Sequence, residues 1–154
     1  MKTLHLQENV SLAPLTWMKV GGVADYYAEV RTKEGLLDAF AFAKSKNLPI
    51  VFLGQGSNVI LPDEGIRGLV LRLVNDEVRY DMNSLADAAI VTVEGGTILS
   101  RLIHEARKKG LKGLNNFVGI PGTVGAAVCG NIGIPSEEFG EIVRSLEIFD
   151  GEHF

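Results

Sequence analysis

A run of glycine and other small residues at positions 117–127 most restricts what this chain can fold into. It reads Phe-Val-Gly-Ile-Pro-Gly-Thr-Val-Gly-Ala-Ala. Glycine has no Cβ, so such a backbone can turn sharply and approach a ligand or a neighbouring element closely. Thr123 suits an N-cap, and Val124 is therefore expected to open a short helix whose N–H groups point at the loop, a geometry that suits an anion. The alternative is a tight turn before a small-residue helix that packs against a sheet.

The composition excludes several classes of function. The chain has 154 residues, with 15 Lys and Arg against 19 Asp and Glu and a formal net charge of −4. This balance gives no general attraction to nucleic acid or to an anionic membrane, so neither is expected as a partner. A phosphate ligand would have to be held locally, by backbone N–H groups.

Cysteine and histidine usage points away from disulfides and metals. The single cysteine, Cys129, excludes an internal disulfide framework and a cysteine-rich zinc site, and it is expected to be a small buried residue. The histidines show no spacing typical of a metal site. Residues 1–9 contain no apolar run, so neither a signal peptide nor a membrane span is expected, and a cytoplasmic location follows by default.

The first half of the chain predicts a strand, a helix and a second strand in succession. Residues 26–30 are rich in aromatic and β-branched types, which favour strands. Thr32 is a plausible N-cap for a helix that ends near Asn47 and Pro49. The apolar run at residues 50–53 is typical of a strand buried on both faces of a parallel sheet. A ligand of such a unit is expected at the carboxyl end of the second strand.

A second glycine-rich stretch, Leu-Gly-Gln-Gly-Ser-Asn at residues 53–58, lies at that carboxyl end. Its glycines allow a sharp turn, while Ser57 and Asn58 offer short polar side chains and N–H groups to a phosphate oxygen. A dinucleotide fingerprint would need glycine where the chain has Val59, and no lysine follows in P-loop spacing. Those two nucleotide folds are disfavoured, whereas a glycine-rich anion loop is not. The alternative is a plain strand-to-strand turn.

The second half of the chain predicts a further sheet with helices. Residues 69–73 are expected to return as a strand that closes a first lobe. Strands at residues 78–80 and 89–94 should flank a polar loop at 81–87. A helix with an apolar arc is expected to run from Thr97 to a C-terminal Gly110.

The last residues combine a strand pattern with a turn. Residues 141–149 predict a strand, and Asp150-Gly151 is a strong signal for a two-residue hairpin turn. The few residues that follow are too short to form a return strand. The sequence therefore leads us to expect that the chain stops inside a domain.

Motifs in a fixed order carry a family resemblance. They are Thr16 with Gly21-Gly22-Val23-Ala24-Asp25, residues 53–58, residues 119–127, and Asn131-Ile132-Gly133 followed by Glu138 and Gly140. This order resembles the UDP-N-acetylenolpyruvoylglucosamine reductase family, in which the motifs belong to an FAD-binding domain of the PCMH type shared with vanillyl-alcohol oxidase. The resemblance implies an α+β fold of two lobes. The first, about residues 1–74, would hold a small β-α-β parallel sheet, and the second, about 75–154, a mostly antiparallel sheet with helices.

The resemblance also implies a reaction. NADPH reduces FAD held between the lobes, and hydride then passes to the enolpyruvyl double bond of UDP-N-acetylglucosamine enolpyruvate, which yields UDP-N-acetylmuramate for peptidoglycan. The FAD is expected to be held without a covalent bond. The residues expected to bind it are Leu53, Gly54, Gln55, Gly56, Ser57, Asn58, Gly119, Ile120, Pro121, Gly122, Thr123, Val124, Gly125, Asn131 and Gly133.

Departures from the family pattern restrict what can be carried over. The loop at residues 134–139 is longer than the family's usual one and lacks its tyrosine, and Gln55 and Ala126 stand where glycine is common. The family's catalytic arginine, serine and glutamate would lie beyond Phe154. No catalytic residue is therefore expected within these 154 residues, a C-terminal substrate-binding domain is expected to be absent, and the chain alone is expected to be inactive.

Two other functions fit the same residues. The chain could be a non-catalytic nucleotide- or phosphate-binding module whose glycine loops hold a smaller ligand. Alternatively, the glycines could serve only turns and close packing of helices on sheets.

Overall fold

The computed structural model describes residues 4–82 and 88–153. They form two compact units, the first made of the described residues up to Asn75 together with those from Ile148 onward, the second made of the described residues of Asp76–Glu147. The division near residue 75 lies close to the expected lobe boundary. The residues from Ile148 onward were expected to belong to the second lobe, but they belong to the first unit. There the ring of Phe149 packs edge-on against Phe40, with centroids 4.8 Å apart.

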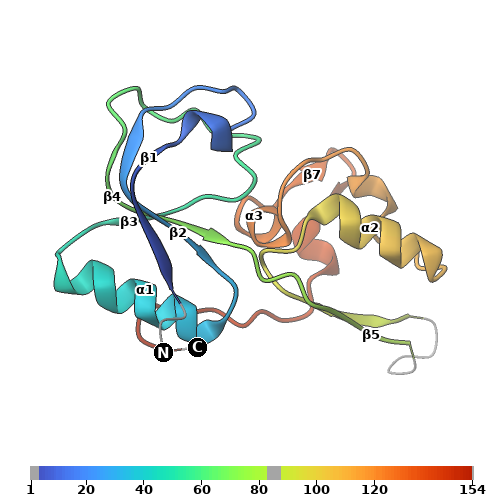
Figure 1. Ribbon diagram of the computed structural model, residues 1–154. Coiled ribbons are helices and arrows are strands. Elements are labelled where there is room, and N and C mark those ends of the chain that lie inside the picture. The colour runs from blue at the N-terminus through green and yellow to red at the C-terminus, as the bar shows by residue number, and fades with distance from the viewer. Residues whose placement is uncertain (1–3, 83–87, 154) are drawn as a thin grey trace. The chain divides into compact units, whose positions relative to one another are not determined.

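A mixed sheet forms the centre of the first unit (Figure 1). Its strand order is β1 (His5–Ser11), β2 (Val23–Val30), β4 (Ile66–Leu73) and β3 (Ile50–Phe52). β2, β4 and β3 run parallel, and β1 pairs antiparallel with β2. The expected strand-helix-strand unit is present, but β4 lies between its two strands.

Helix α1 (Lys33–Ser45) begins where the sequence predicts. The Thr32 side chain accepts a hydrogen bond from the Gly35 N–H at 3.1 Å, which satisfies a donor that a helix start leaves free. Leu36, Ala39 and Ala43 on its buried face pack with the sheet. The sheet residues of this cluster are Ala28, Val30, Leu69 and Leu71.

Two features of this sheet differ from the sequence-based prediction. The run at residues 50–53 was expected to be buried on both faces, but β3 is an edge strand and Phe52 is 53% exposed. β1 was not predicted, because most of its side chains are exposed and Leu6 and Val10 are its only large apolar residues. Its strand conformation comes from pairing with β2, which local sequence does not reveal.

The second unit contains short antiparallel pairs and helices. The predicted strands are present as the antiparallel pair β5 (Val78–Asp81) and β6 (Ile90–Val93). Part of the loop expected at 81–87 lies outside the described residues. The remaining elements are α2 (Leu99–Lys108), the 3-10 turn η2 (Asn115–Phe117), α3 (Val124–Cys129), the pair β7 (Gly133–Ile134) and β8 (Glu137–Glu138), and the 3-10 turn η3 (Phe139–Ile142). A further 3-10 turn, η1 (Ala13–Leu15), belongs to the first unit.

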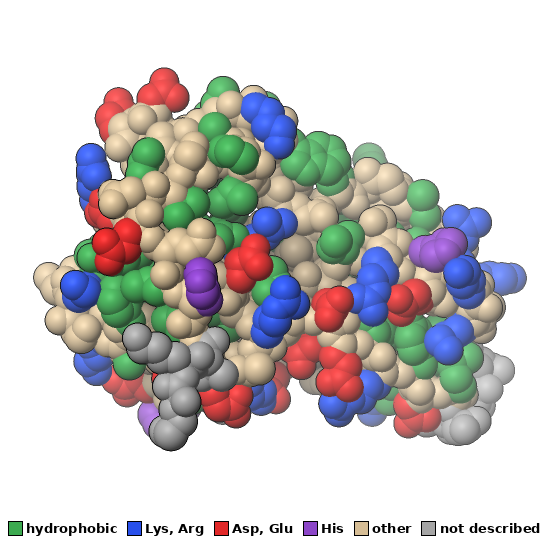
Figure 2. Space-filling model, in the orientation of Figure 1, with side chains coloured by type: hydrophobic (Ala, Val, Ile, Leu, Met, Phe, Trp, Pro, Cys, Tyr) green, Lys and Arg blue, Asp and Glu red, His purple; other side chains and the backbone are tan. Residues whose placement is uncertain are grey.

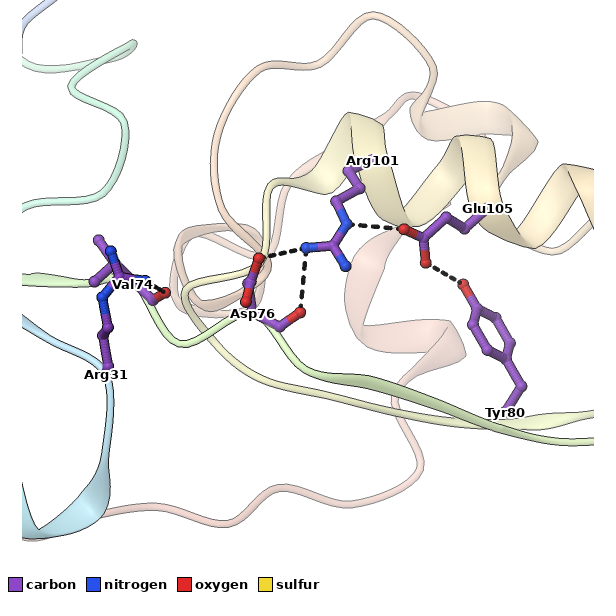
Figure 3. A network of polar contacts seen from close by, with 6 residues as sticks. All are labelled: Arg31, Val74, Asp76, Tyr80, Arg101 and Glu105. Carbon is purple, nitrogen blue, oxygen red and sulfur yellow. Dashed lines mark hydrogen bonds and ion pairs between the residues drawn. The ribbon is translucent and has the colours of Figure 1, made fainter.

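An ion-pair network fixes α2 to the start of this unit (Figure 3). Arg101 contacts the carboxylates of Asp76 and Glu105, and the Tyr80 hydroxyl donates to Glu105 at 3.4 Å. The hydrogen bond from Arg101 lowers the pKa of Glu105, while partial burial and the Glu105 charge raise the pKa of Tyr80. These groups lie near solvent, so the network orients α2 more than it stabilises the fold.

The prediction of a strand at residues 141–149 is wrong. Those residues begin with the end of η3 and continue without regular structure, and Leu146 and Ile148 are 54% and 67% exposed. Within residues 4–82 and 88–153, no strand pairs with this segment. The Asp150 turn does form, because its carboxylate accepts from the N–H groups of Glu152 and His153 at 2.9 and 2.7 Å.

Candidate functional site

The loop at residues 53–58 leaves β3 with its backbone donors open. The N–H of Leu53 completes the sheet by donating to the Leu71 carbonyl at 2.8 Å. In the part of the chain that the structure describes, the following N–H groups have no protein acceptor: Gly54, Gly56, Ser57 and Asn58. Successive open N–H groups in a turn make an anion-binding concavity, which is what the sequence predicted for this loop.

Gly56 makes the loop's conformation depend on the absence of a side chain. Its φ is +65°, in the left-handed region. A Cβ there would lie 2.3 Å from the Leu15 carbonyl oxygen and 2.9 Å from the Thr16 Cα. The Gly56 carbonyl in turn accepts from the Trp17 N–H at 2.9 Å. The glycine therefore serves close packing of two protein segments, and the packing holds the open donors in place.

The loop borders a hollow of about 200 Å³ in the first unit. Its lining residues are Pro14, Leu15, Thr16, Trp17, Lys19, Gln55 and Arg72. The Trp17 side chain is 61% exposed, so an aromatic face is available to a ligand. Thr16 is buried, and its hydroxyl donates to the Val20 carbonyl at 3.0 Å, which fixes this segment.

Sequence reasoning missed the cations and the aromatic ring of this hollow. A usable signal for Arg72 was present, because Leu71 and Leu73 pack with the α1 side of the sheet and strand alternation therefore places Arg72 on the other face. On that face, burial and the Glu29 charge raise the pKa of Tyr27, while Arg72 lowers it. Trp17 and Lys19 lie in an irregular segment, which periodicity does not describe.

The backbone N–H groups at the start of α3 were expected to be free, but they have protein acceptors. The Thr123 hydroxyl caps the helix by accepting from the Ala126 N–H at 3.3 Å, as predicted. However, the N–H of Val124 donates to the Thr97 carbonyl and that of Gly125 to the Gly95 carbonyl, each at 2.8 Å. These three donors are already satisfied by the protein. The expectation that they point freely at an anion is therefore wrong.

The second glycine-rich stretch packs against residues 95–98, which explains why its N–H groups are satisfied and why its residues are small. A Cβ on Gly125 would lie 2.9 Å from the Gly95 carbonyl oxygen. The Gly122 carbonyl accepts from the Leu99 N–H at 3.0 Å. Gly119, Ile120 and Pro121 lie nearer the surface, and a Cβ on Gly119 would have nothing within 4 Å. This part of the stretch is the one a ligand can reach.

Asn131 and Gly133 have structural partners in the second unit. The Asn131 amide donates to Glu138 at 2.6 Å and its oxygen accepts from the Gly140 N–H at 2.8 Å. A Cβ on Gly133 would lie 2.5 Å from the Glu137 carbonyl oxygen. Both residues thus hold the small β7–β8 pair, which is formed by the loop that departs from the family pattern.

Cys129 is exposed at the end of α3, so the prediction of a buried cysteine is wrong. The thiol lies on the side of this short helix away from Val124 and Ala127, which are its buried residues. We expect one thiol per chain to react with Ellman's reagent in the native protein as fast as in denaturant, because exposure removes any need for opening. A Cys129→Ser variant is the blank. Reaction only after denaturation would contradict this exposure.

No helix within the described residues is long and apolar enough to cross a membrane. No group of three or more histidine, cysteine or acidic side chains that could hold a metal ion occurs among those same residues. The groups that the hollow and the loop at residues 53–58 offer are backbone N–H donors, two cationic side chains and an exposed indole.

Comparison with known proteins shows what the chain as a whole is similar to. The chain is 38% identical over 148 residues to the UDP-N-acetylenolpyruvoylglucosamine reductase of Solibacter usitatus, a match that covers 96% of this chain and 46% of the relative. It is 37% identical over 147 residues to the enzyme of that name from Moorella thermoacetica, covering 96% and 47%. The chain thus spans less than half the length of these relatives.

Solved structures agree on the fold. The UDP-N-acetylenolpyruvylglucosamine reductase of Thermus caldophilus superposes with a TM-score of 0.69 at 35% identity, covering 88% of this chain and 45% of that one. Cholesterol oxidase from Brevibacterium sterolicum, at 14% identity and a TM-score of 0.61, shares the fold alone. The expected α+β fold of two lobes is confirmed. Residues 24–152 match the family described as FAD binding domain, and the chain therefore belongs to the FAD-binding domain family.

Proposed function

We propose that this chain is the FAD-binding part of a UDP-N-acetylenolpyruvoylglucosamine reductase, which reduces UDP-N-acetylglucosamine enolpyruvate with NADPH in peptidoglycan synthesis. Relatives of that name match along nearly the whole chain. The motif order from Thr16 to Gly140 supports the same assignment. Because the chain spans less than half of each relative, the complete reaction and its substrates are part of this proposal.

The open donors of the loop at residues 53–58 carry the proposal. FAD contains a diphosphate, and an oxyanion gains most from N–H donors that are already oriented before it binds. The donors of Gly54, Gly56, Ser57 and Asn58 meet this condition, since they lack acceptors among the described residues. The residues present therefore fit the cofactor.

The residues of each unit have separate proposed tasks. Gly54 to Asn58, preceded by the buried Leu53, would hold the diphosphate, and Gln55 would line its pocket. The surface part of the second stretch, Gly119 to Pro121, would contact another portion of FAD, while Gly122 to Gly125, Asn131 and Gly133 would keep that stretch in shape. When bound, FAD would supply hydride transfer from NADPH to the enolpyruvyl double bond.

The test is a titration of the purified protein with FAD, followed by flavin fluorescence. We expect saturable binding of one FAD per chain, and we expect all of the flavin to be released by acid precipitation. Non-covalent binding follows from the histidine and cysteine placement, since His5, His104, Cys129 and His153 are all exposed and none belongs to either glycine stretch. A protein mass raised by one flavin would contradict the non-covalent mode.

A titration with ADP distinguishes the proposed flavin-binding domain from the alternative, a nucleotide- or phosphate-binding module. A flavin-binding domain should bind FAD much more tightly than ADP, because the isoalloxazine ring adds contact area that ADP lacks. A nucleotide- or phosphate-binding module should bind ADP at least as tightly. Equal affinity for the two ligands, or no uptake of FAD, would overturn the proposed function.

A further inference from the structure

Two cationic side chains line the hollow that the loop at residues 53–58 borders through Gln55, and neither has a carboxylate partner among the described residues. They are Lys19 and Arg72, and Gly56, the neighbour of Gln55, packs on Leu15 and Thr16, which line the same hollow. We propose that Lys19 and Arg72 neutralise the diphosphate of FAD and are specificity-determining residues for a phosphate-bearing flavin. This inference rests on the proposed function.

The place of this pair in the hollow, together with its lack of a carboxylate partner, sets it apart. Arg67, Arg79 and Arg101 form ion pairs, Arg67 with Asp25 at 2.8 Å. Across the described residues, neither Lys19 nor Arg72 forms an ion pair with a carboxylate. The face drawn in Figure 2 shows basic and acidic side chains interspersed, so the molecule has no broad positive field there. In a chain of net charge −4, attraction for a dianion has to be local, and these two cations would add to that of the open N–H groups.

The nearest carboxylate to Arg72 by strand register is already engaged. Glu29 on β2 pairs in register with Arg72 on β4. Its Oε1 accepts from the Tyr27 hydroxyl at 3.0 Å. Tyr27 also interacts with Arg72. Among the described residues Arg72 forms no ion pair with Glu29 or with another carboxylate, so its charge remains available to a ligand in the hollow.

Both cations are held on rigid backbone. Arg72 belongs to β4, which has hydrogen-bonded neighbours on both sides. Lys19 has a φ of +57°, which the turn closed by its N–H donating to the Thr16 carbonyl at 3.3 Å maintains. Its Nζ donates to the Pro14 carbonyl at 3.2 Å, so the ammonium rests at the rim of the hollow. Pre-oriented charges lower the ordering cost of binding.

The experiment compares FAD affinity in Lys19→Gln, Arg72→Gln and the double variant, at low and high salt. We expect about tenfold weaker binding for each single variant and on the order of a hundredfold for the double variant at low salt, because each removes a charge-assisted contact. The difference should shrink at high salt, since salt screens the wild-type attraction. Arg67→Gln is the matched control, because it removes an exposed arginine from the same strand, and it should bind like wild type.

A rescue variant and tryptophan quenching distinguish the possible outcomes of this experiment. Arg72→Lys should retain most of the affinity, since it keeps the charge. Quenching of Trp17, the only tryptophan and a lining residue of the hollow, reports occupancy of this site. Wild-type affinity in the double variant, or a loss that salt does not change and Arg72→Lys does not rescue, would overturn the inference. Failure of the wild type to bind FAD would instead overturn the proposed function.

Discussion

Replacing Gly56 with valine is expected to abolish FAD binding and to destabilise the first unit. The φ of +65° costs a β-branched residue about 1–3 kcal/mol. The Cβ would also lie 2.3 Å from the Leu15 carbonyl oxygen, so the segment that carries Trp17 has to move. Overlap of this kind adds roughly 1–3 kcal/mol. Because the same movement disturbs the open donors, affinity and stability should fall together.

The measurement combines urea denaturation with FAD titration. Gly113→Val is the matched control, because a Cβ at that position has nothing within 4 Å and the residue has no positive φ. Gly110→Ala isolates the backbone effect, since its φ is +80° in open space and it belongs to neither glycine-rich stretch. Unchanged stability and unchanged FAD affinity in Gly56→Val would contradict the role given to Gly56. The sequence alone predicts that Gly56→Val loses FAD binding with little loss of folding, and the contact with Leu15 adds the loss of stability.

Features set by neighbouring residues could be predicted from the sequence. Thr32 and Thr123 were both predicted as N-caps and both accept from a backbone N–H of the helix they begin. The strand at β2 and the pair β5–β6 follow the same logic, since aromatic and β-branched residues fit a pleated surface. In each case the decisive contact lies within a few residues or on the next strand.

Features that depend on residues distant in the sequence could not be predicted. The exposed face of β3 follows from its place at the sheet edge, which strand order decides and residues 50–53 do not encode. The false strand at 141–149 has a suitable alternation but no pairing partner among the described residues. Pattern alone specifies which side chains share a face, whereas a strand also needs a neighbour for its backbone groups.

The candidate site also has one part that the sequence predicted correctly and one part that it did not. The open donors of Ser57 and Asn58 were predicted, because the glycines that precede them turn the chain away from the strand. The donors at Val124 and Gly125 were predicted to be free as well, but carbonyls about 25–30 residues earlier in the chain accept from them. A glycine-rich stretch thus has one appearance in sequence and two uses: approach to a ligand, or approach to another backbone.

Replacing Phe117 with alanine is expected to have the largest effect in the second unit. The ring is fully buried and meets Phe139 edge-on, with centroids 5.1 Å apart. It belongs to the cluster that joins α2 to α3 through Leu99, Leu102 and Val124. Removing a buried phenyl ring leaves a cavity and costs about 3–5 kcal/mol, a large part of the stability of a small domain.

The consequence should reach the second glycine stretch, because the Phe117 carbonyl accepts from the Ile120 N–H at 3.2 Å and the ring anchors that turn. Hydrogen exchange should therefore speed up in peptides from α2 and from residues 117–125, and the urea midpoint should fall. Val118→Ala is the control, since Val118 is 54% exposed and substitutions at such sites stay within about 0.5 kcal/mol. Equal urea midpoints for the two variants would show that the Phe117 ring does not hold this core together.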